Sequence, residues 1–204
     1  SESLLSRFQE QYDRGDFATS LRFAQLAQKL WKDDPPAEVL HAIADGSIHQ
    51  ANVLLSDAAT GGVLSLAEAD PATQREAKAR LLDAGEAFRR HASKVVLTDN
   101  VAYGESLWAA ADAFDRAGDL ELCVATFQQF ATEFPADTRR PEAVFRLAQA
   151  YRARGDLELA AKLYQELVDL RGVPDGSGPY ADLSFVPLAQ TLLHDADPAN
   201  DTRG

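Results

Sequence analysis

Apolar side chains recur along the chain at intervals of three and four residues, which is the spacing of one face of an α-helix. In the segment 141–154, for example, Val144, Leu147, Ala148 and Tyr151 fall on a single stripe. Similar stripes run through much of the chain, and Gly, Pro and Asp residues separate them. The pattern therefore predicts a series of short helices joined by tight turns.

The first hundred residues show the same pattern with weaker boundaries. Residues 16–31 are expected to form one helix. Residues 37–57 are expected to form either two short helices or one helix that is broken at Gly46. Asp70 and Pro71 have the residue types of an N-cap and of a first helical position, so they predict a long helix that extends to about residue 96.

Composition supports helices and limits the partners. The 204 residues include 36 Ala and 26 Leu, which favour helices, against 11 Val and 2 Ile, which favour strands. The formal net charge of −12 disfavours binding to nucleic acid or to an anionic membrane surface. No apolar run approaches the roughly 18 residues of a membrane span. The single cysteine, Cys123, lies in an apolar stretch and is expected to be a buried hydrophobic residue.

Three segments place an aromatic residue shortly before a Gly-Asp pair, and these pairs are Gly15-Asp16, Gly118-Asp119 and Gly155-Asp156. The last two glycines are 37 residues apart. The first two are 103 residues apart, close to three units of about 34 residues. Glycine adopts the left-handed conformation that ends a helix, and aspartate accepts hydrogen bonds from the first N–H groups of the next one. Each pair therefore predicts the turn of a helical hairpin, and the hairpin is repeated.

The residues around the second and third turns resemble the tetratricopeptide repeat, a helix pair of about 34 residues. Small residues, Ala148 and Ala160, stand where the paired helices of this family approach closely, and Tyr164 stands at an aromatic position of the second helix. In the preceding unit, Pro135 falls where the closing proline of the family lies. The resemblance implies an all-α fold: a right-handed superhelical solenoid of antiparallel helix pairs, roughly five in number.

The resemblance also divides the chain. Repeats are expected at about 104–137 and 141–172, with a partial one at 182–204, and residues 1–100 are expected to form degenerate helical-hairpin repeats. We expect 1–100 and 101–204 to make one continuous solenoid. The last repeat is cut short, since residues 200–204 carry no apolar stripe. An open end exposes core surface, so the sequence predicts either a fragment of a longer array or a dimer that covers this end.

A binding surface follows from the same resemblance. In the family, fixed positions on the first helix of each repeat line a concave groove. These positions correspond here to Glu105, Trp108, Asp112, Asp115, Glu142, Phe145, Gln149 and Arg152. Trp108 and Phe145 are the expected anchors, because aromatic side chains contribute strongly to interfaces, although both could instead be buried against neighbouring helices. The aspartates favour a peptide of basic or mixed charge that binds as an extended segment or a helix.

Within the family, the 37-residue period and the segment 130–151 resemble the bacterial extracytoplasmic type. This type occurs in outer-membrane-assembly lipoproteins and in Tol–Pal coordinating proteins. The resemblance implies an adaptor in the periplasm or cell envelope, with a cytoplasmic location as the alternative.

His41, Asp45 and His49 follow one another at four-residue intervals and would share one face of a continuous helix. Imidazole and carboxylate groups at this spacing could hold a zinc ion together with a fourth ligand. A solvated polar face explains the same spacing. His91 and His194 stand alone in the sequence and indicate no site.

No catalytic motif is present, whether G-x-S-x-G, H-E-x-x-H, a phosphate loop or G-x-G-x-x-G. The sequence therefore predicts no catalytic residue and no cofactor. We expect a non-catalytic protein–protein interaction scaffold that binds a peptide or a partner helix in its groove. Two alternatives stay open: a self-associating assembly or regulatory module of a larger cell-envelope protein, and a metal-dependent enzyme that uses His41, Asp45 and His49.

Overall fold

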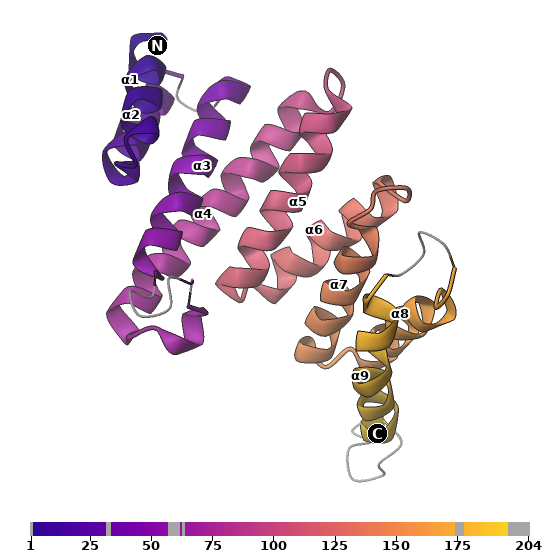
Figure 1. The fold of residues 1–204 in the computed structure, drawn as a ribbon. Helices are drawn as coiled ribbons and strands as arrows, with labels where there is room; N and C mark the ends of the chain where they lie inside the picture. The colour runs from indigo at the N-terminus through magenta and orange to yellow at the C-terminus, as the bar shows by residue number, and fades with distance from the viewer. Residues whose placement is uncertain (1, 32–33, 57–61, 63, 174–177, 196–204) are drawn as a thin grey trace. The chain divides into compact units, whose positions relative to one another are not determined.

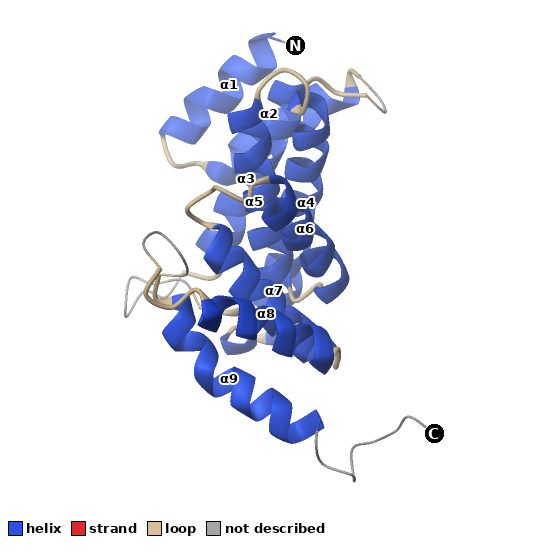
Figure 2. Ribbon diagram, turned by 90° about the vertical axis from the view of Figure 1, so that its right-hand side faces the viewer, coloured by secondary structure: helices blue, strands red, loops and turns tan. Residues whose placement is uncertain are grey.

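The computed structural model describes residues 2–31, 34–56, 62, 64–173 and 178–195. Within these ranges the chain forms nine α-helices, one short 3-10 helix and no β-sheet (Figures 1 and 2). The predicted all-α fold is therefore confirmed.

The helices fall into two compact units, Ser1–Asp119 and Leu120–Gly204. The first unit contains α1 (Glu2–Asp13), α2 (Phe17–Lys29), α3 (Ala37–Leu54), η1 (Leu66–Glu68), α4 (Pro71–Val95) and α5 (Asn100–Ala117). The second contains α6 (Leu120–Glu133), α7 (Arg140–Arg154), α8 (Leu157–Asp169) and α9 (Tyr180–Asp195). Within each unit every α-helix packs on the next one along the chain, as helical hairpins do. None of the described helices combines the length and the apolarity needed to cross a membrane.

The helix α3 is continuous, so the expected break at Gly46 is wrong. Gly46 is buried, and a Cβ atom added to it would lie 3.1 Å from the Cβ of Leu21 in α2. The glycine thus allows α2 and α3 to approach closely, and the packing between them offsets its weak helix propensity.

The helix α4 begins and ends as predicted. The Asp70 carboxylate accepts hydrogen bonds from the N–H groups of Ala72 and Thr73, at 3.0 and 3.2 Å, and Pro71 occupies the first turn. Farther along, Gly85 faces the ring of Phe114 in α5. The close contact at Gly85 brings α4 and α5 together in the core of the first unit.

In the second unit, the apolar stripe of α7 is buried, and so are Ala160, Tyr164 and Leu167 of α8. Cys123 of α6 is buried, as predicted. The expected number of roughly five pairs is not reached within the described residues, because α9 stands without a second helix there. The end of the predicted partial repeat, residues 196–204, lies outside the described residues.

All three Gly-Asp pairs form the predicted turn. Gly15, Gly118 and Gly155 have φ angles of 77°, 67° and 92°. In each turn the N–H of the aspartate donates to the carbonyl five residues earlier, at 2.9 to 3.0 Å. The side chains differ, however. Asp16 caps α2 by accepting from the N–H of Thr19, whereas Asp156 makes no cap. The expectation of an aspartate cap is therefore wrong for Asp156, whose carboxylate pairs with Arg154 instead.

Candidate functional site

Four of the eight predicted groove residues lie along α7 in the second unit. Gln149 and Arg152 are exposed, whereas Glu142 and Phe145 are half-buried. The Arg152 guanidinium donates a hydrogen bond to the side-chain oxygen of Gln190 in α9, at 3.2 Å. The α7 residues therefore form an accessible strip that is bordered by α9.

Phe145 divides its surface between packing and solvent. Its ring centroid lies 5.9 Å from that of Tyr164 in α8 and 5.6 Å from that of Tyr180 in α9. Near the latter contact, burial and the Glu142 carboxylate both raise the pKa of the Tyr180 hydroxyl. One part of Phe145 is thus fixed by two neighbouring aromatic rings, and the other part stays accessible to a ligand.

The other four predicted residues lie on α5 in the first unit. Glu105 is exposed, and Trp108, Asp112 and Asp115 are half-buried. The Asp112 carboxylate lies 3.7 Å from the guanidinium of Arg116. Arg116 in turn donates to the side-chain oxygen of Asn52 in α3, at 2.6 Å. Part of the negative charge of this strip is therefore balanced within the unit, and its arginine is held in place by α3.

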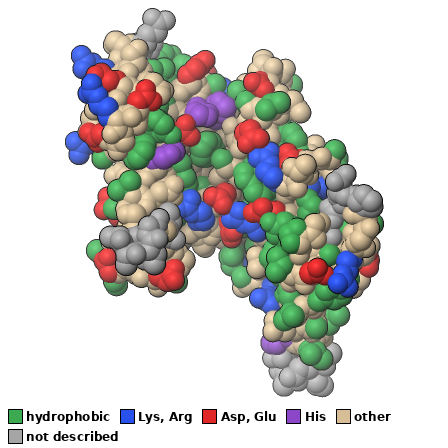
Figure 3. All heavy atoms as spheres, in the orientation of Figure 1, with side chains coloured by type: hydrophobic (Ala, Val, Ile, Leu, Met, Phe, Trp, Pro, Cys, Tyr) green, Lys and Arg blue, Asp and Glu red, His purple; other side chains and the backbone are tan. Residues whose placement is uncertain are grey.

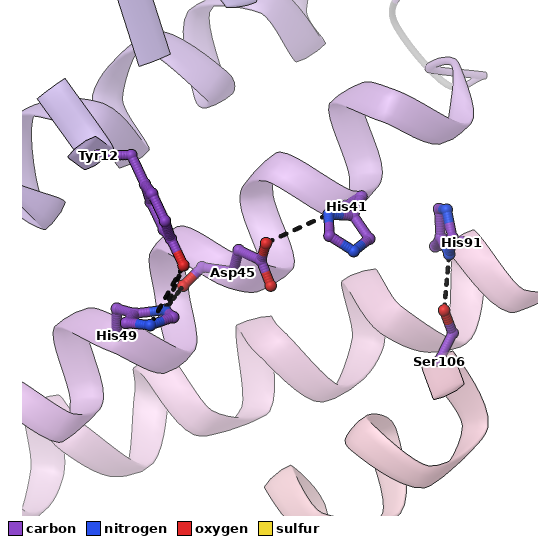
Figure 4. Close-up of polar contacts among 6 residues, drawn as sticks. All are labelled: Tyr12, His41, Asp45, His49, His91 and Ser106. Carbon is purple, nitrogen blue, oxygen red and sulfur yellow. Dashed lines mark hydrogen bonds and ion pairs between the residues drawn. The ribbon is translucent and has the colours of Figure 1, made fainter. Parts of the chain in front are cut away.

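The polar residues of α3 belong to a cluster between α1, α3, α4 and α5 (Figure 4). The Nδ1 atom of His41 lies 3.2 Å from the Asp45 carboxylate. The His49 ring turns toward α1 instead, where the Tyr12 hydroxyl lies 3.2 Å from Nε2. Its Nδ1 atom lies 2.9 Å from the backbone carbonyl of Asp45, which can only accept a hydrogen bond. The cluster thus separates into a His41–Asp45 pair and a His49–Tyr12 pair.

His91 of α4 extends the first pair, although the sequence indicated no partner for it. Its ring centroid lies 5.1 Å from that of His41, and its Nδ1 atom lies 2.7 Å from the Ser106 hydroxyl of α5. These contacts join residues 50 and 15 positions apart, which no short sequence pattern could reveal. His91 therefore does not stand alone in the folded chain, contrary to the expectation from the sequence.

Burial shifts the pKa of two members of this cluster, His91 and Asp45. It lowers the pKa of His91 below its ordinary value of 6.5, and the nearby His41 acts in the same direction. Three carboxylates, of Glu38, Asp45 and Asp99, act against this shift. Burial also raises the pKa of Asp45, against the opposite effect of the three surrounding histidines. Both shifts follow from the removal of charge from water.

His41, Asp45 and His49 do not converge on a common point, because the His49 ring points away from the Asp45 carboxylate (Figure 4). Across the described part of the chain, no group of three or more His, Cys, Asp or Glu side chains is arranged to hold a metal ion. The geometry therefore gives no support to a zinc site at these three residues.

A comparison with protein families identifies the repeats. The segments 105–137 and 142–170 match the family model of the tetratricopeptide repeat. These two segments of the chain are thus similar to tetratricopeptide repeats. The first matched segment runs from α5 to α6 and the second from α7 to α8. A comparison with curated proteins found no significant match.

Proposed function

We propose that the chain is a non-catalytic scaffold that binds a peptide or a partner helix through the first helices of its two tetratricopeptide repeats. Repeats of this family generally mediate protein–protein interactions. The observation that carries the proposal is the accessibility of the eight groove positions. None of them is buried, whereas the apolar stripes beside them on α5 and α7 are buried almost completely.

The charges of the two strips specify the ligand. The α5 strip carries three carboxylates, those of Glu105, Asp112 and Asp115, and the α7 strip ends at the exposed guanidinium of Arg152. The α5 strip favours basic side chains of a ligand, and Arg152 on the α7 strip favours an acidic group, so a peptide of mixed charge suits the two sets of charges. Trp108 and Phe145 would supply apolar contacts beside these charges.

Site-specific photo-cross-linking in the native host tests this proposal. A photoreactive residue at Glu105 or at Gln149 should capture the same protein, because both positions lie on the proposed binding strips. The matched control is Gln129, an exposed residue on the second helix α6. Capture from Gln129 alone would place the partner on a different surface and would refute the proposal.

Affinity measurements with the captured protein, once purified, give the second readout. Arg152→Glu should raise Kd about tenfold or more, as expected for a hot-spot residue. The control Lys78→Glu reverses an exposed charge on α4 and should leave Kd within about twofold. Trp108→Ala should also weaken binding while Tm changes by only a few degrees. A large fall in Tm would show that Trp108 belongs to the core.

We further propose that the scaffold works in the bacterial cell envelope, a role supported by the resemblance of the segment 130–151 to extracytoplasmic repeats. Fractionation of the native host should recover the protein in the periplasmic or membrane-associated fraction. Recovery with a cytoplasmic marker would contradict this location without affecting the binding proposal.

A further inference from the structure

The helix α9 buries one side and leaves a broad apolar side uncovered. Its residues Ala181, Ser184, Leu188 and Thr191 are buried, where α9 packs on α7 and α8. On the other side, four large apolar residues are exposed: Phe185 by 42%, Val186 by 64%, Leu192 by 52% and Leu193 by 74%. Ala189 lies between them and is also exposed. We call these five residues the α9 face. In Figure 3, green apolar atoms are visible on the surface near the grey C-terminal residues.

The α9 face has the same residue pattern as the buried face of α7. The pattern Phe185-x2-Leu188-Ala189-x2-Leu192 repeats the pattern Val144-x2-Leu147-Ala148-x2-Tyr151. On α7 all four of these residues are buried, and α8 packs on that helix. On α9, only Leu188 of the four is buried. Among the described residues, the α9 face therefore lacks the covering helix that the equivalent face of α7 has.

Residues 196–204 do not carry the side chains of such a helix. Residues 196–204 read Ala-Asp-Pro-Ala-Asn-Asp-Thr-Arg-Gly and contain no large apolar side chain. A helix that covers Phe185 and Leu192 must contribute large apolar side chains of its own. Its source must lie outside these nine residues.

We propose that the α9 face is the surface through which two copies of this chain associate, by antiparallel packing of α9 on the α9 of the second copy. A twofold axis near Ala189 would set Phe185 and Val186 of one copy beside Leu192 and Leu193 of the other. Apolar residues then meet apolar residues in both halves, as an isologous interface requires. The small side chain of Ala189 allows the helix axes to approach at the centre.

The surroundings of the face suit a second copy. Asp182 lies at its edge and forms an ion pair with Arg171, at 2.9 Å, so its charge is already balanced. The Arg171 guanidinium lies 5.2 Å from the centroid of the Phe185 ring. Beside Leu192, a hollow of about 250 Å³ between α8 and α9 offers space for a side chain of the other copy. The face thus combines an apolar centre with a polar edge, as interfaces do.

The size of the face predicts a weak dimer. An exposed side chain of this kind contributes on the order of 100 Å², so each copy offers roughly 500 Å². Two copies would bury about 1,000 Å², which is the lower limit for a specific interface. We therefore expect a dimer with a Kd in the micromolar range.

Sedimentation equilibrium of the 204-residue chain tests the association. The average mass should rise from monomer to dimer between about 1 μM and 1 mM, around a micromolar Kd. Leu193→Glu should raise this Kd at least tenfold, and it should leave the fold intact because Leu193 is largely exposed. The control Leu97→Glu introduces the same charge at a residue that is 94% exposed in the first unit, and it should leave the Kd unchanged.

A cysteine placed near the proposed axis tests the arrangement. Ala189→Cys should form a disulfide-linked dimer under mild oxidation, because two Cβ atoms near a twofold axis can come within about 4 Å. Ala79→Cys, at an exposed alanine of α4, should remain monomeric. The buried Cys123 is common to both variants and does not affect the comparison.

Three results would overturn the proposal: a chain that stays monomeric up to 1 mM, a dimer that Leu193→Glu does not weaken, or an Ala189→Cys variant that does not cross-link. A monomer whose binding to the captured partner is weakened by Leu193→Glu would assign the face to that partner instead. The groove proposal is measured separately, through Arg152→Glu, so each proposal can fail without the other.

Discussion

Replacing Gly85 with alanine tests the packing of α4 on α5. In most helix interiors this substitution stabilises the protein by about 1 kcal/mol, because glycine has a low helix propensity. At Gly85, however, an added Cβ atom would lie 2.5 Å from Cε1 and 2.7 Å from Cδ1 of Phe114. Carbon atoms in favourable contact are about 3.5 to 4.0 Å apart. Phe114 is completely buried, so its ring has little room to move away.

The two effects have opposite signs, and their sizes decide the outcome. Forcing an extra methyl group into a packed core typically costs about 1 to 3 kcal/mol. Set against a propensity gain of about 1 kcal/mol, the clash should prevail, and Gly85→Ala should lower the free energy of unfolding by about 1 kcal/mol. In a Phe114→Leu background the outer ring atoms are gone. There the same substitution should become neutral or stabilising, so the two positions should couple by about 1 to 2 kcal/mol.

Urea unfolding followed by far-ultraviolet circular dichroism measures this cycle in four proteins: the wild type, the two single variants and the double variant. The slope of the free energy against urea should be the same in all four, so that changes in midpoint report stability alone. If Gly85→Ala stabilises the wild-type protein, then α4 and α5 do not approach at this residue as described. The inference from the close contact would then be refuted.

Two further predictions concern buried polar groups. The pKa of His91 is lower in the folded chain than its ordinary value of 6.5. His91 therefore contributes to the free energy of unfolding above pH 6.5, and this contribution is lost as the pH falls below 6.5. Tm should therefore drop less steeply between pH 7.5 and 5.0 in His91→Gln than in the wild type. The exposed control His194→Gln should show the same decrease in Tm as the wild type. An equal decrease in Tm in all three proteins would contradict the burial of His91. The Tyr164 hydroxyl is buried and has no hydrogen-bond partner among the described residues, so Tyr164→Phe should raise the free energy of unfolding by up to about 1 kcal/mol. Tyr151→Phe, which removes a hydroxyl that donates to α6, should not raise it, and a loss of stability in Tyr164→Phe itself would mean that its hydroxyl is paired.

The features that could be predicted from the sequence are local. Gly118 and Gly155 end helices because a glycine in the left-handed conformation needs no help from distant residues. Asp70 caps α4 through N–H groups two and three residues away. The helical stripes and the two repeats follow from spacings that lie within a single hairpin.

The features that could not be predicted depend on residues far apart in the chain. Gly46 has the same propensity in any helix, and only the approach of Leu21 explains why α3 continues through it. His91 has no partner within its own helix, and it meets His41 and Ser106 only because three helices pack together. In the candidate site, the family pattern identified Phe145, but its aromatic contacts with α8 and α9 required the packed unit.

The sequence by itself thus determined that the chain is helical, where most helices begin and end, and which segments resemble tetratricopeptide repeats, because these properties arise from interactions within a few turns of chain. Tertiary structure alone decided which faces are covered. It separated His49 from the His41–Asp45 pair, and it left the α9 face exposed while burying the matching face of α7. The same residue pattern occurs on both helices, so the difference lies in the presence of a neighbouring helix, and that is a property of packing.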